Sequence, residues 1–278
     1  MKQRVNGKQI SSGNQIISGK QISSRNQIIS WIKSSWPPIA VVFSLLLGWQ
    51  VGVTLANTPQ WLLPSPLHIL QEVTVEWPKL QVHLISTIQL ISLGYVVGCV
   101  FGVLIGFFLH HLPWARSGLY PLLVVSQNIP IIALAPLLMI WFGFGVVPKL
   151  LVILLICFFP VSVNLLDGLR QTDRSSYHYL QMIGASKKQI FFKLEFPYAL
   201  PYLFSGLKIS ATYSVMGAVI AEWLGSFQGI GVYMLLSKNS FQTDHVFLAI
   251  GLIVILALGL NGLISLIEHA VIRWNKKG

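Results

Sequence analysis

Residues 184–201 read GASKKQIFFKLEFPYALP and interrupt a chain that otherwise consists largely of long apolar segments. The stretch is charged and rich in lysine, yet Ile190, Phe191 and Leu194 are expected to form an apolar ridge along a helix. A plain connection between two membrane spans needs only a few polar residues. An apolar ridge on a helix outside the membrane indicates instead that a partner offers a groove for it.

Local capping signals predict that this stretch belongs to a helical hairpin. Asp173 is suited to cap a first short helix, and Gly184 supplies the left-handed residue that ends it. Ser186 caps the second helix, and Gln189 completes a capping box with it. Pro197 is expected to stop that second helix.

The composition of the chain is that of an integral membrane protein. Hydrophobic residues make up 54% of the 278 residues and charged residues 10%, and the mean hydropathy is +0.69. These values are too apolar for an ordinary soluble domain. About 20 apolar residues cross the hydrocarbon layer as a helix. We therefore predict an all-α membrane protein with six transmembrane helices, at residues 37–56, 84–109, 119–142, 150–169, 203–225 and 246–268.

The distribution of lysine and arginine predicts the orientation of these spans. With the N-terminus in the cytoplasm, all but three of the 19 basic residues lie on the cytoplasmic side, as the positive-inside rule requires. The three exceptions are Lys79, Lys149 and Lys238. We expect a multi-pass protein of the cell (inner) membrane with both termini cytoplasmic. Topology and anionic membrane lipid explain the formal charge of +11, so nucleic acid is not an expected partner.

These features divide the chain into four parts. Residues 1–36 form a basic cytoplasmic tail of low complexity, in which residues 7–30 read GKQISS, GNQIIS, GKQISS and RNQIIS. We interpret this tail as disordered and in contact with lipid, with partner binding as the alternative. Residues 37–79 hold the first span and an outer segment, residues 80–268 the main membrane domain, and residues 269–278 a basic cytoplasmic end.

Polar residues and prolines within the apolar spans are candidates for a solute path, because broken helices at membrane depth persist beside protein or a water-filled cavity. The alternative is a kinked helix whose polar groups are hydrogen-bonded across a packing interface. Glu222, an acid within a predicted span, fits either a gate or path residue or interfacial packing. The path candidates are Gln127, Asn128, Pro130, Asn164, Tyr213, Ser214 and Glu222.

The hairpin resembles the coupling loop of ABC-importer permeases, whose pattern is Glu-Ala-Ala, three residues, Gly, nine residues, an aliphatic residue, one further position, and Leu-Pro. Gly184 falls at the glycine and Leu194 at the aliphatic position, and Phe196-Pro197 closes the motif. His178-Tyr179-Leu180 stands where the Glu-Ala-Ala would be. The resemblance covers residues 80–268 and implies the type-1 permease fold. It also implies that a separate ATPase subunit docks at Gly184, Ala185, Ser186, Gln189, Leu194, Phe196 and Pro197.

The same resemblance implies the partners of the chain. A second copy completes a homodimer around a central path, an extracytoplasmic binding protein delivers a small polar solute, and membrane lipid surrounds the spans. ATP and Mg are bound by the ATPase subunit, so no cofactor is expected in this chain. Residues 120–149 and 217–234 resemble permeases of the nitrate, sulfonate and taurine group, most closely those that import the hydroxymethylpyrimidine precursor of thiamine. That precursor is the expected solute, and a sulfonate, taurine or nitrate is the alternative.

Two other classes of protein fit the sequence less well. A membrane enzyme needs paired carboxylates, a metal cluster, or a nucleophile beside its base. The adjacent pair His110-His111 has neither an acidic neighbour in sequence nor the i,i+4 spacing of a helical zinc site, so we predict no catalytic residue and no metal site. An ion-coupled secondary transporter requires repeated halves, and no internal repeat is evident across the six spans.

Overall fold

The computed structural model describes residues 36–272, so the repeat at residues 7–30 and most of the basic C-terminal end lie outside the described residues. The chain divides into two units, one of residues 1–59 and 65–67 and the other of residues 60–64 and 68–278. In the first unit the described chain is mainly the apolar helix Trp36–Leu55, which is long enough to cross a membrane. This helix confirms the predicted first span.

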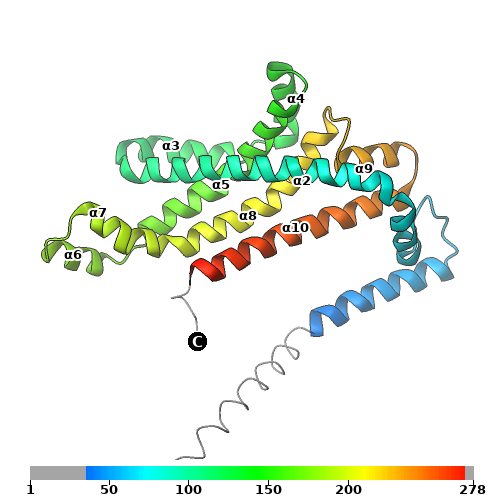
Figure 1. Ribbon diagram of the computed structural model, residues 1–278, viewed down its shortest axis with the longest axis horizontal. Coiled ribbons are helices and arrows are strands. Elements are labelled where there is room, and N and C mark those ends of the chain that lie inside the picture. Colours follow the sequence, from blue (N-terminus) through cyan, green and yellow to red (C-terminus); the bar gives the residue numbers. More distant parts are fainter. Residues whose placement is uncertain (1–35, 273–278) are drawn as a thin grey trace, which may run out of the picture. The chain divides into compact units, whose positions relative to one another are not determined.

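In the described part of the second unit, the regular elements are all helices, joined by loops (Figure 1). The helices α2, α5, α8 and α10 run alongside one another, with α6 and α7 at one end and α9 at the other. Along the chain the elements are α2 (Pro66–His111), α3 (Pro113–Ser126), α4 (Ile131–Phe142), α5 (Val146–Arg170), α6 (Arg174–Met182), α7 (Lys187–Ile190), the π-helical turn η1 (Phe191–Glu195), α8 (Phe196–Trp223), α9 (Ile230–Asn239) and α10 (Thr243–Val271).

The expected six spans are present, but the third is broken. Among the described residues, five helices are long and apolar enough to cross a membrane, and the pair α3 and α4 makes a sixth if it counts as one span. The two helices of this pair are bent by 102° at their junction. Pro130 follows the last residues of α3 and lacks the N–H that would continue its hydrogen bonding. The span predicted at residues 119–142 is therefore present as two helices, with the break at the polar residues and Pro130 where a kinked or broken helix was expected.

A row of glycines lets α2 lie directly against α5. Gly94, Gly98, Gly102 and Gly106 recur every fourth residue and so lie on one face of α2. A Cβ at Gly98 would lie 2.7 Å from Cys157 Cβ, and one at Gly102 would lie 2.6 Å from the carbonyl oxygen of Phe158. Small residues permit such close backbone contact between membrane helices, where dispersion contacts supply most of the association energy. We call this contact the glycine seam.

The second hairpin helix continues into the next span without a stop, which corrects the expectation for Pro197. The helix Lys187–Trp223 is continuous, with η1 between α7 and α8. In η1 the backbone hydrogen bonds join residues five apart, and not four apart as in an α-helix. The N–H of Phe196 donates to the carbonyl oxygen of Phe191. Pro197 lies in the first turn of α8, where its missing N–H and fixed φ are tolerated. The hairpin is thus joined rigidly to a membrane-spanning helix.

Candidate functional site

The hairpin begins and turns as its capping signals predict. The Asp173 carboxylate accepts hydrogen bonds from the backbone N–H groups of Ser175 and Ser176, the latter at 2.8 Å. Gly184 has φ +82° and ends the first helix. Ser186 Oγ accepts from the N–H of Gln189 while Gln189 Oε1 accepts from the N–H of Ser186, which is a complete capping box. All of these bonds join residues of the hairpin that lie close together in sequence.

The predicted apolar ridge faces inward, which corrects the expectation that a partner covers it. Ile190 is 1% exposed. The centroid of the Phe191 ring lies 5.8 Å from that of Phe107, which is near the end of α2. The Phe191 ring also contacts the imidazole rings of His110 and His111. Glu195 Oε2 lies 3.3 Å from His110 Nε2, so this histidine does have an acidic neighbour in space. The ridge therefore anchors the hairpin to α2.

A different set of apolar side chains on the hairpin is exposed. Tyr179, Met182 and Ile183, near the end of α6, are 60%, 80% and 61% exposed. They flank the turn at Gly184, and we call them the tip patch. Of the residues expected at the docking site, Gly184, Ser186 and Gln189 are exposed, whereas Ala185, Leu194, Phe196 and Pro197 are half-buried. The tip patch was missed because the apolar face of the hairpin was sought only on its second helix, at Ile190, Phe191 and Leu194.

The Asp173 cap gives the hairpin a specific pH dependence. Hydrogen bonds from the Ser176 hydroxyl and from the N–H groups of Ser176 and Ser175 lower the pKa of the Asp173 carboxyl. Because the pKa is depressed in the folded state, the stabilisation is fully present above the ordinary value of about 3.9 and is lost as the pH falls through the lowered value. We expect Asp173→Ala to speed amide hydrogen exchange at Ser175 and Ser176 at neutral pH. Equal exchange in the variant and the wild type at neutral pH would contradict this role.

A hollow of about 610 Å³ opens where the third span is broken. Its walls come from the α3–α4 junction, α5 and α8. Most of the lining is apolar, and the polar side chains in it are Ser126, Gln127, Asn128 and Tyr213. Four of the seven predicted path residues therefore gather here, namely Gln127, Asn128, Pro130 and Tyr213.

The other three path candidates do not line this hollow. Asn164 Nδ2 donates to the carbonyl oxygen of Pro160, one turn earlier in α5. Ser214 is fully buried and its hydroxyl donates to the carbonyl oxygen of Ala211. Both side chains thus bond within their own helix, in the manner of packing residues.

Glu222 is buried in a hydrogen-bonded junction of three helices. Its side chain belongs to α8, and the residue is 1% exposed. Thr87 Oγ1 of α2 donates to Glu222 Oε1 at 2.7 Å and accepts from the N–H of Ile230 at 2.8 Å. The N–H of Gly231 donates to Glu222 Oε2 at 2.7 Å. The carboxylate thereby binds the first turn of α9, where free N–H groups and the helix dipole favour an acid.

The glycines beside Glu222 are required by its side chain. A Cβ at Gly229, which has φ +132°, would lie 2.2 Å from Glu222 Cδ, and one at Gly231 would lie 3.0 Å from Oε2. The N–H of Gly229 also donates to His83 Nδ1 of α2. Sequence reasoning identified Glu222 but missed Thr87 and His83, since they lie far away along the chain. We call Glu222, Thr87 and the first turn of α9 the Glu222 junction.

A bundle of apolar spans, a hollow at a broken helix and a capped hairpin at one end together define a membrane transport subunit. The family described as "Binding-protein-dependent transport system inner membrane component" matches residues 98–273. The chain belongs to this family. It is therefore a multi-pass inner-membrane permease subunit of the ABC-importer class, as the resemblance of the hairpin implied.

Relatives agree with this assignment, and a solved structure shares the fold. The chain is 33% identical over 241 residues to the formylaminopyrimidine transport permease protein ThiX of Halalkalibacterium halodurans, covering 86% of this chain and 96% of the relative. It is 31% identical over 250 residues to the riboflavin transport system permease protein RibX of Chloroflexus aurantiacus, covering 87% and 92%. A crystal structure of an amino acid ABC transporter with histidines shares the fold, with a TM-score of 0.60 and 14% identity over 73% of this chain and 98% of that chain.

Proposed function

We propose that two copies of the chain, with both termini in the cytoplasm, form the membrane path of an ATP-driven importer, and that an ATPase subunit docks on the hairpin through the tip patch. The observation that carries this proposal is an exposed apolar patch on a rigid element. Met182 and Ile183 expose most of their surface, although their hairpin is well capped. Exposed apolar side chains that cluster on an ordered element are typical of a protein interface.

The connection of the hairpin to the membrane supports the same proposal. From Lys187 the helix runs unbroken to Trp223, a distance of about 55 Å at 1.5 Å per residue. One wall of the hollow, including Tyr213 and Met216, belongs to this helix. A displacement of the hairpin by the ATPase would thus move the wall of the hollow directly. We propose that the hollow is part of the solute path.

Charging the tip patch is expected to uncouple the ATPase. Placing carboxylates at an apolar interface leaves them desolvated without partners, so Met182→Asp with Ile183→Asp should lower ligand-stimulated ATP hydrolysis roughly tenfold or more. The assay uses the chain reconstituted with its ATPase and binding protein in lipid nanodiscs. Gln181→Asp, on the same helix and also exposed, is the matched control and should leave stimulation unchanged. Full stimulation in the double variant would exclude docking at this patch.

For the solute, we propose a thiamine pyrimidine precursor. This proposal is supported by the similarity to the formylaminopyrimidine permease, but the riboflavin relative is nearly as similar. The test measures which solute the cognate binding protein retains and which solute drives uptake into vesicles. Retention of a pyrimidine precursor at low micromolar concentration is the expected result. Preference for a sulfonate, taurine or nitrate would assign the alternative solute, and uptake without the ATPase would indicate a secondary transporter.

A further inference from the structure

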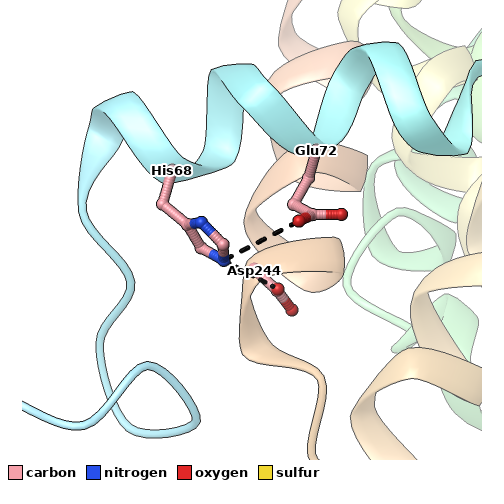
Figure 2. A group of neighbouring side chains, drawn as sticks. All are labelled: His68, Glu72 and Asp244. Carbon is pink, nitrogen blue, oxygen red and sulfur yellow. Dashed lines mark ion pairs between the residues drawn. The ribbon is translucent and has the colours of Figure 1, made fainter.

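At the end of the second unit opposite the hairpin, three side chains converge that are not explained by transport. His68 and Glu72 lie one turn apart on α2, and Asp244 lies in the first turn of α10 (Figure 2). His68 Nε2 is 3.4 Å from Asp244 Oδ2 and 3.9 Å from Glu72 Oε1. One ligand atom from each residue lies within 4.8 Å of the other two. We propose that these residues bind a divalent transition-metal cation, with Zn²⁺ as the probe ion.

The spacing of the three atoms fits a metal ion. Zinc binds imidazole nitrogen and carboxylate oxygen at about 2.0–2.2 Å in a tetrahedral arrangement, which separates neighbouring ligand atoms by about 3.4 Å. The distance between His68 Nε2 and Asp244 Oδ2 equals that separation, and the distance from His68 Nε2 to Glu72 Oε1 is 3.9 Å, slightly longer than that. A mixed set of imidazole and carboxylates favours Zn²⁺ and similar transition ions over Ca²⁺ or Mg²⁺, which prefer oxygen ligands alone.

Surrounding groups orient the ligands. Asp244 Oδ1 accepts a hydrogen bond from the N–H of His245 at 2.9 Å, which turns Oδ2 toward His68. Glu72 Oε2 lies 3.7 Å from His245 Nε2, which leaves Oε1 for the site. His245 in turn stacks on Tyr233 of α9. Such second contacts fix the direction of metal ligands and raise affinity.

Charge and access are also suitable. Two carboxylates face one imidazole, so a dication neutralises the site. The side chains of His68, Glu72 and Asp244 are 24%, 23% and 20% exposed, so an ion can enter from solvent while a fourth position remains for water. A bound ion would hold the beginning of α2 to the first turn of α10. No metal site was expected from the sequence, because the i,i+4 pair of His68 and Glu72 is completed by Asp244 only in the folded chain.

The test is zinc binding by the purified full-length chain in detergent after EDTA treatment. We expect about one Zn²⁺ per chain, with a Kd in the low micromolar range and a rise in Tm. Asp244→Asn should weaken binding at least tenfold. His111→Ala is the matched control, because His111 belongs to the adjacent histidine pair at the other end of α2, and it should bind zinc normally.

His68→Arg separates a metal site from a plain ion pair. Arginine keeps a positive charge between the two carboxylates but cannot bind the ion. The variant should fold as judged by gel filtration and Tm without zinc, yet lose both zinc binding and the zinc-dependent rise in Tm. Zinc binding by His68→Arg or Asp244→Asn that equals the wild type, or a wild type that takes up no zinc at millimolar concentration, would overturn the proposal.

Discussion

Glu222→Ala is expected to lower the free energy of unfolding by about 2–5 kcal/mol, because it leaves buried polar groups without partners. Thr87 Oγ1 and the N–H of Gly231 both donate to this carboxylate, and the residue is only 1% exposed. The first turn of α9 would lose the acid that binds its free N–H groups. Thermal or denaturant unfolding in detergent measures the change, and hydrogen exchange at residues 230–233 reports whether α9 frays.

The contrast with another acid of the chain sharpens this prediction. Glu268 of α10 forms an ion pair with Lys208 of α8, and both side chains are partly exposed. A partly exposed pair contributes about 1 kcal/mol or less, so Glu268→Ala should be much milder than Glu222→Ala. A double variant with Thr87→Val should cost less than the sum of its single variants, since both remove the same bond. A loss for Glu222→Ala of about 1 kcal/mol or less, as expected for Glu268→Ala, would show that the Glu222 junction does not stabilise the fold.

Gly102→Leu should prevent the close contact of α2 with α5 and destabilise the protein by about 4 kcal/mol or more. Even a Cβ at this position would lie 2.6 Å from the carbonyl oxygen of Phe158 and 2.9 Å from Val161 Cβ. A backbone carbonyl cannot move aside as the end of a flexible side chain can. The two helices must therefore separate, and they lose contacts along the whole glycine seam. Yield of monodisperse protein and Tm in detergent are the measurements.

A glycine elsewhere in the bundle controls for the change in helix propensity. A Cβ at Gly259 of α10 would have no atom of the described residues within 4 Å, so Gly259→Leu adds the same side chain where there is room. Leucine favours the helix over glycine by about 0.8 kcal/mol, and we expect this variant to be at least as stable as the wild type. If the Gly102→Leu variant had the same Tm as the Gly259→Leu variant, the glycine seam would not be a close contact in the folded protein.

Features that depend on near neighbours in sequence could be predicted, and those that depend on distant ones could not. The Asp173 and Ser186 caps follow from residues two or three positions away, and they form as expected. Hydropathy located the spans for the same reason. The inward direction of Phe191 could not be foreseen, because its partners Phe107 and His110 come from α2. An apolar face indicates that something covers it, and does not say whether the cover belongs to the same chain.

The remaining differences also have physical causes. The early part of α2 carries Glu72, Glu76 and Lys79, so hydropathy placed the start of this helix at residue 84, whereas it begins at Pro66. The helix α9 was not expected, because it is a short element whose beginning is stabilised by Glu222 from α8 instead of by a local cap. In both cases tertiary contacts, and not local signals, decide the structure.

The unbroken helix Lys187–Trp223 also limits how the length of this protein can vary. One residue inserted anywhere in it would rotate everything beyond by about 100° and shift it by about 1.5 Å. If the hairpin end of the helix kept its place, Glu222 would point away from Thr87. If the Glu222 end kept its place, Phe191 would lose its contact with Phe107. Substitutions leave this geometry intact, whereas insertions and deletions do not. The number of residues from the Ser186 cap to Glu222 is therefore expected to be constant among functional relatives, while length differences fall in the loops.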